Sequence, residues 1–115
     1  MTQLNSFEAH TYNIERLRYL SNGYLGSVSD DKSVKLWNTT TWNLIFSYTG
    51  HSNYVFDVAY LGNDLYASGS SDNTIQIWQL PSGLMMQSIN VAAALRCLQL
   101  LPNGNLASGD TSSNI

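Results

Sequence analysis

The stretch Leu65-Tyr66-Ala67-Ser68-Gly69-Ser70-Ser71-Asp72-Asn73-Thr74-Ile75-Gln76-Ile77-Trp78 decides the fold of this 115-residue chain, because its pattern occurs twice. The earlier copy occupies residues 24–37, at an offset of 41 positions. The same offset relates four pairs of identical residues: His10 and His51, Ser27 and Ser68, Asp31 and Asp72, and Trp37 and Trp78. A spacing kept by four residue types predicts an internal repeat.

A third, truncated copy follows at an offset of 40 positions and stops before its tryptophan. Val91 stands where the first two copies have histidine, and Ser112 stands where they have aspartate. We therefore divide the chain into a leading segment (1–7), a first repeat (8–49), a second repeat (50–90) and a truncated third repeat (91–115).

Each copy alternates short runs rich in Val, Ile, Leu and Tyr with turn residues about every ten positions, a pattern that predicts antiparallel strands. Glycine and asparagine between the first two runs of each copy are typical of hairpin turns. Strands are expected at 4–7, 13–20, 24–29, 33–37, 44–48, 54–61, 65–70, 74–78 and 85–89.

Gly50-His51, followed by residues 65–70 and 72–78, resembles the WD repeat of the WD40-type β-propeller family. The resemblance covers nearly the whole chain. It implies an all-β fold, a partial β-propeller built of four-stranded antiparallel blades. One departure is that Asn38 and Gln79 follow the tryptophans where the family has aspartate.

Propellers usually contain four to eight blades, and this sequence predicts fewer than three. Such an arc is open unless further blades or other chains complete it, and we expect further blades in a longer protein. Self-association of several open copies is the alternative. The strand expected at 4–7 is what ring closure would use in this family.

Serine, histidine and aspartate occur together in both complete copies, which raises the possibility of a catalytic triad. The set occurs twice at one period and always with a tryptophan, whereas a catalytic site needs it once. The resemblance implies a structural network in which the histidine bridges serine and aspartate. Its members are His10, Ser27, Asp31, Trp37, His51, Ser68, Asp72 and Trp78, and we expect no catalytic residue.

Composition excludes several other classes of function. Five scattered basic residues and a net charge of −3 leave no basic stripe for nucleic acid. The single cysteine, Cys97, excludes an intrachain disulfide, and its apolar neighbours predict a core position. Both histidines lie in the repeat register, so we expect no metal and no cofactor. No stretch is typical of a membrane span or a secretory signal, which favours the cytoplasm or nucleus.

The resemblance also implies a rim at which partners bind, formed by three positions in each copy. They are the third and fifth residues after the histidine and the residue before the turn aspartate: Asn13, Glu15 and Asp30, then Tyr54, Phe56 and Ser71, then Ala94, Arg96 and Thr111. Aromatic residues and arginine dominate interface energies, although Tyr54 and Phe56 could instead pack between blades.

The expected function is that of a non-catalytic scaffold for other proteins or peptides. The alternatives are an inert fragment of a longer WD-repeat protein and the propeller domain of an enzyme.

Overall fold

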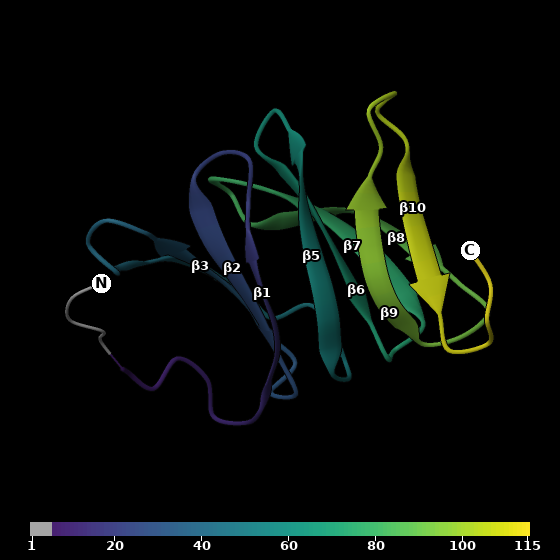
Figure 1. Cartoon of the computed structure of the whole chain (residues 1–115), viewed down its shortest axis with the longest axis horizontal. Coiled ribbons are helices and arrows are strands. Elements are labelled where there is room, and N and C mark those ends of the chain that lie inside the picture. Colours follow the sequence, from purple (N-terminus) through teal and green to yellow (C-terminus); the bar gives the residue numbers. More distant parts are fainter. Residues whose placement is uncertain (1–5) are drawn as a thin grey trace.

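The computed structural model describes residues 6–115, and their strands form three antiparallel sheets (Figure 1). The first sheet contains β1 (Ile14–Tyr19), β2 (Tyr24–Ser29), β3 (Val34–Asn38) and β4 (Leu44–Tyr48) in that order. The second contains β5 (Val55–Gly62), β6 (Leu65–Ser70), β7 (Thr74–Gln79) and β8 (Leu84–Asn90). The third pairs β9 (Leu95–Leu100) with β10 (Leu106–Asp110). The described chain is therefore all-β, with two complete blades and one two-stranded blade.

The strands lie close to their expected positions. β2, β4 and β6 have the expected bounds, and the other expected strands of the two complete blades differ by one residue at one or both ends. Ser33, for example, precedes β3, because its amide and hydroxyl both donate to Asp31 in the preceding turn. The strand expected at 4–7 begins outside the described residues, and its described part, Ser6 and Phe7, is not in a strand.

No helix that could cross a membrane occurs in the described part of the chain.

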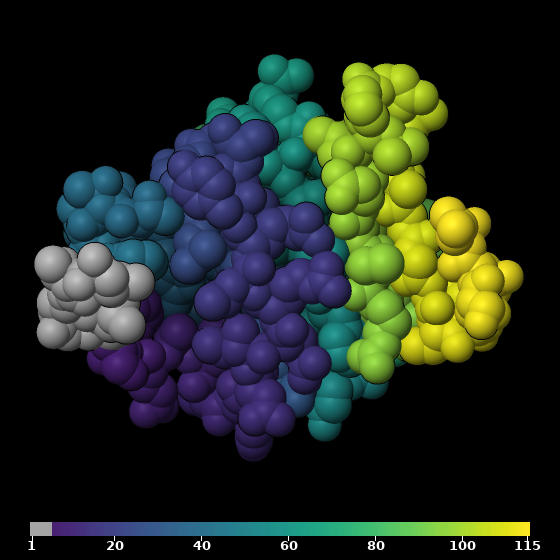
Figure 2. All heavy atoms as spheres, in the orientation of Figure 1, coloured from purple at the N-terminus to yellow at the C-terminus, as the bar shows by residue number. Residues whose placement is uncertain are grey.

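Neighbouring blades pack through apolar side chains. The space between the ribbons is largely filled by atoms in the space-filling view (Figure 2). The first core lies between the first two blades and consists of Leu20, Val28, Val34, Leu36, Tyr48, Val55, Val58, Tyr66 and Trp78. The second lies between the second and third blades and consists of Ala59, Ala67, Ile75, Leu95 and Leu98. Gly26 permits the close approach, because a Cβ there would lie 2.8 Å from Val58 Cγ1.

Stacked aromatic rings join the first blade to the second. Tyr48, at the end of β4, stacks on the buried Trp78 ring with centroids 4.6 Å apart, and Tyr66 covers the ring at 4.8 Å. Phe7 lies 41 positions before Tyr48 and contacts the equivalent Trp37, but its ring is tilted by 59°, with the centroids 5.1 Å apart. Phe7 thus holds the repeat position of a strand end, although the backbone around it is not a strand.

Two faces of the arc carry residues that no described blade covers. Leu17 is 59% exposed, whereas its repeat equivalents Val58 and Leu98 are buried between blades. Cys97 is exposed, so the prediction of a core position is wrong. The reason is that β9 packs on the second blade through Leu95 and Leu98, and no sheet among the described residues covers Cys97.

We expect Leu98→Ala to lower the free energy of unfolding by about 2–5 kcal/mol, because it opens a cavity between the second and third blades. Leu17→Ala, at the equivalent repeat position, should change it by no more than about 0.5 kcal/mol. Urea denaturation followed by tryptophan fluorescence measures both. Equal losses would show that the outer face of the first blade is covered in solution.

Candidate functional site

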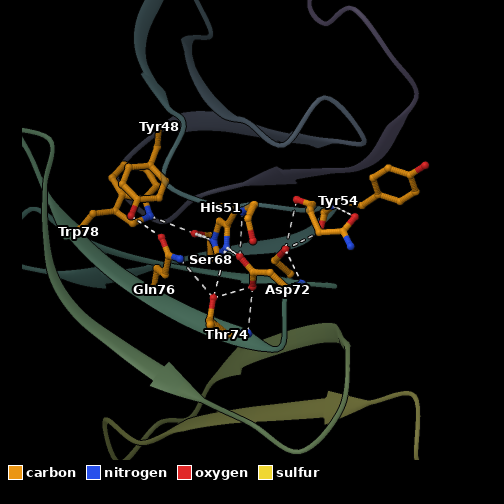
Figure 3. A network of polar contacts seen from close by, with 11 residues as sticks. Tyr48, His51, Tyr54, Ser68, Asp72, Thr74, Gln76 and Trp78 are labelled. Carbon is orange, nitrogen blue, oxygen red and sulfur yellow. Dashed lines mark hydrogen bonds and ion pairs between the residues drawn. The ribbon is translucent and has the colours of Figure 1, made fainter.

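A polar network ties together the loops of the second blade (Figure 3). His51 precedes β5, Ser68 lies on β6 and Trp78 on β7. The imidazole contacts Asp72 Oδ2 through Nδ1 at 2.9 Å and Ser68 Oγ through Nε2 at 2.7 Å. The Trp78 indole donates to Ser68 Oγ at 3.1 Å. The donors and acceptors match if tryptophan donates to serine, serine to histidine and histidine to aspartate.

The first blade contains the same network. His10 contacts Asp31 Oδ2 at 2.8 Å and Ser27 Oγ at 2.6 Å, and Trp37 donates to that oxygen at 2.9 Å. All eight residues singled out from the repeat are therefore brought together in two sets of four.

The third copy closes its turn differently. Its Asp110 accepts the amides of Ser112 and Asn114 at 2.8 and 3.0 Å, and Val91 packs against the second core.

Hydrogen bonds keep the network carboxylates ionised. Burial by itself would raise the pKa of Asp31, but the bonds from Ser33 and His10 outweigh it and lower the pKa to about 2. The pKa of Asp72 is lowered in the same way, with burial opposed by Thr74 and His51. Burial lowers the pKa of the His51 imidazole despite the carboxylate of Asp72, so the ring is neutral at pH 7.

This arrangement is unsuited to nucleophilic catalysis. Ser27 and Ser68 are fully buried, and each hydroxyl is engaged by an indole and an imidazole, which leaves no approach for a substrate. Asp72 instead accepts the Ser52 amide at 3.1 Å and joins the loop before β5 to the β6–β7 turn. No cluster of metal-binding side chains occurs in residues 6–115.

A second polar cluster, around Asp57, was missed by sequence reasoning. Asp57 is fully buried and accepts bonds from Arg16 at 3.2 Å and from Arg18 at 2.9 and 2.8 Å. It also accepts the Leu98 amide at 2.8 Å, so one carboxylate joins β1, β5 and β9. The available signal was an aspartate at the strand position where the other copies have Arg16 and Cys97.

The nine predicted rim positions lie at one end of the blades, where the backbone pairs two of them in every copy. Asp30 donates its amide to the Asn13 carbonyl, Ser71 to Tyr54, and Thr111 to Ala94, at 2.9, 2.9 and 3.0 Å. These bonds close the turn after the second strand onto the loop before the first. The rim backbone is therefore fixed by the fold.

The rim side chains differ in how far they reach into solvent. Tyr54 is 46% exposed and points away from the network (Figure 3), so it does not pack in the core between blades. Phe56 is half-buried, and the guanidinium of Arg96 lies over its ring at 4.4 Å. Asn13 and Glu15 are exposed. The rim thus combines an exposed tyrosine, a stacked arginine and carboxyl groups.

Comparison with known proteins agrees with this architecture. Residues 1–38 and 42–79 match the family model described as WD domain, G-beta repeat. No curated protein matches the sequence significantly. The chain is similar to the crystal structure of the WD40 β-propeller domain of Doa1, with a TM-score of 0.79 and 24% identity. The match covers 89% of this chain and 35% of that one, so this chain spans about a third of it. The expected fold class is confirmed.

We expect Asp72→Ala to lower the free energy of unfolding by about 2–4 kcal/mol, because bonds to the charged carboxylate are lost and His51 is left buried without its acceptor. Glu8→Ala, which removes an exposed carboxylate, serves as the control. Thermal and urea unfolding of both variants measure the difference. An unchanged midpoint for Asp72→Ala would count against a stabilising network.

The network also predicts loss of stability in acid. The folded-state pKa of Asp31, about 2, lies below its ordinary value of 3.8. The stability that this carboxylate contributes is therefore complete above about pH 4 and is lost as the pH falls towards 2. The unfolding midpoint of Asp31→Asn should accordingly fall less between pH 4 and pH 2 than that of the unmodified chain. Equal slopes would contradict this assignment.

Proposed function

Because this chain belongs to the WD40 repeat family, we propose that it serves as a non-catalytic scaffold that binds other proteins or peptides through its rim. The observation that carries the proposal is the rim itself, where Tyr54 reaches into solvent and Arg96 lies over Phe56. Tyrosine, tryptophan and arginine supply most of the energy at interfaces. Rigid loops add to it, because little backbone freedom is lost on binding.

The absence of catalysis is part of the proposal. Burial of the serine hydroxyls supports it, because the side chains that could form a triad are committed to the network.

Proteins are favoured over nucleic acid as partners. Arg16 and Arg18 are paired with Asp57, and Arg96 lies over Phe56, which leaves little free positive charge for a phosphate backbone. The single cysteine supports a reducing compartment, and we place the protein in the cytoplasm or nucleus. We further propose that it acts within a larger propeller, since it spans about a third of a solved one.

Site-specific photocrosslinking in cells tests the proposal. A photoreactive amino acid in place of Tyr54 should give discrete protein adducts. The same residue in place of Met86, which is exposed on the outer strand β8, should not. Against the captured partner, Tyr54→Ala should weaken the affinity at least tenfold, and Met86→Ala should leave it nearly unchanged. Adducts at position 86 alone would refute rim binding.

A further inference from the structure

A hollow of about 520 Å³ opens between the first two blades on the rim. Its lining residues come from the loop before β1, the β2–β3 turn and the loop before β5: Tyr12, Asn13, Asp30, Lys32 and Tyr54. Tyr12 is 70% exposed, and Tyr54 stands on the neighbouring blade. The hollow therefore has an aromatic ring from each blade and a carboxyl group in its lining.

The carboxyl of Asp30 is only partly satisfied by its surroundings. Its Oδ1 is shielded from solvent and has no hydrogen-bond partner among the described residues. The neighbouring Asp30 carboxyl, together with burial, raises the pKa of the Glu15 carboxyl. Two carboxyl groups in contact disfavour a second negative charge, and a cation beside them would relieve that repulsion.

The positive groups near the hollow leave the Asp30 carboxyl without an ion pair. Lys32 lines the hollow but forms no ion pair in the described part of the structure. Arg96 lowers the pKa of Glu15 through its charge, but its guanidinium lies over Phe56. That contact shows that an aromatic ring at this rim accepts a guanidinium.

We propose that this hollow receives an arginine side chain of a partner peptide, with Asp30 as its counter-ion and Tyr12 and Tyr54 beside its planar group. Arginine fits better than lysine, because a guanidinium can donate to a carboxylate and stack on aromatic rings at the same time. The inference rests on the proposed function and gives the chemistry of the partner. Lys32 opposes the bound charge and weakens the interaction.

A neutral isostere provides the test. The probes are N-acetyl-arginine amide and N-acetyl-citrulline amide, which differ in charge but little in shape, titrated at millimolar concentrations into the isotope-labelled 115-residue chain. Amide chemical shifts at Asn13, Asp30 and Tyr54 should move with arginine, and citrulline should bind at least tenfold more weakly. Equal responses to the two probes, or no response to arginine, would overturn the proposal.

Two variants that change the charge of the hollow in opposite directions test the proposal further. Asp30→Asn should weaken arginine binding at least tenfold, and Lys32→Gln should strengthen it about two- to threefold. Unchanged spectra elsewhere and an unchanged unfolding midpoint control for folding. Weaker binding by Lys32→Gln, or a preference for N-acetyl-glutamate amide, would indicate an acidic partner and overturn the proposal.

The partner captured by photocrosslinking separates this inference from the proposed function. If Tyr54→Ala abolishes capture and Asp30→Asn does not, the rim binds the partner but the arginine hollow is wrong. If neither variant affects capture, both proposals fail.

Discussion

Each complete blade of this chain has apolar side chains on both faces of one thin sheet, and the rest of the structure depends on this constraint. The second blade directs Val58 and Trp78 towards the first blade and Ala67 and Ile75 towards the third. A single sheet can bury such faces only against neighbours. Blades are therefore stable as a series. Close approach at Gly26 and the Tyr48–Trp78 stack determine how tightly they pack.

The polar networks fix the loops that form the rim. Asp72 holds the Ser52 amide in the loop before β5, and two residues later the Tyr54 carbonyl accepts the Ser71 amide. The buried chain from Trp78 to Asp72 thus ends close to the residues that face a partner. Because the network satisfies the hydrogen bonds of each of its members, the loop has one preferred conformation. The same hydrogen bonds therefore stabilise the blade and hold the rim loops in place.

The part of the structure that repeats could be predicted from the sequence. The parts that depend on residues that differ between the copies could not. Ser68 and Trp78 keep their spacing in both complete repeats, so their strands and shared network follow from the pattern. The role of Asp57 depends on Arg18, which has no charged equivalent in the second copy. The exposure of Cys97 depends on which blades surround it. The hollow depends on Tyr12, whose equivalent in the second copy is Asn53.

Asp57 also has a consequence for how a repetitive chain avoids misassembly. Copies with similar strands can exchange places, and blade swapping within or between molecules is a characteristic error of repeat proteins. If the first and second blades exchanged, Arg18 would take the position of Ala59 in the apolar core between the second and third blades, and Asp57 would lose the Leu98 amide. An unpaired buried charge is strongly unfavourable. The residues that differ between the copies, Asp57 and Arg18, thus favour one order of the blades in the folded chain.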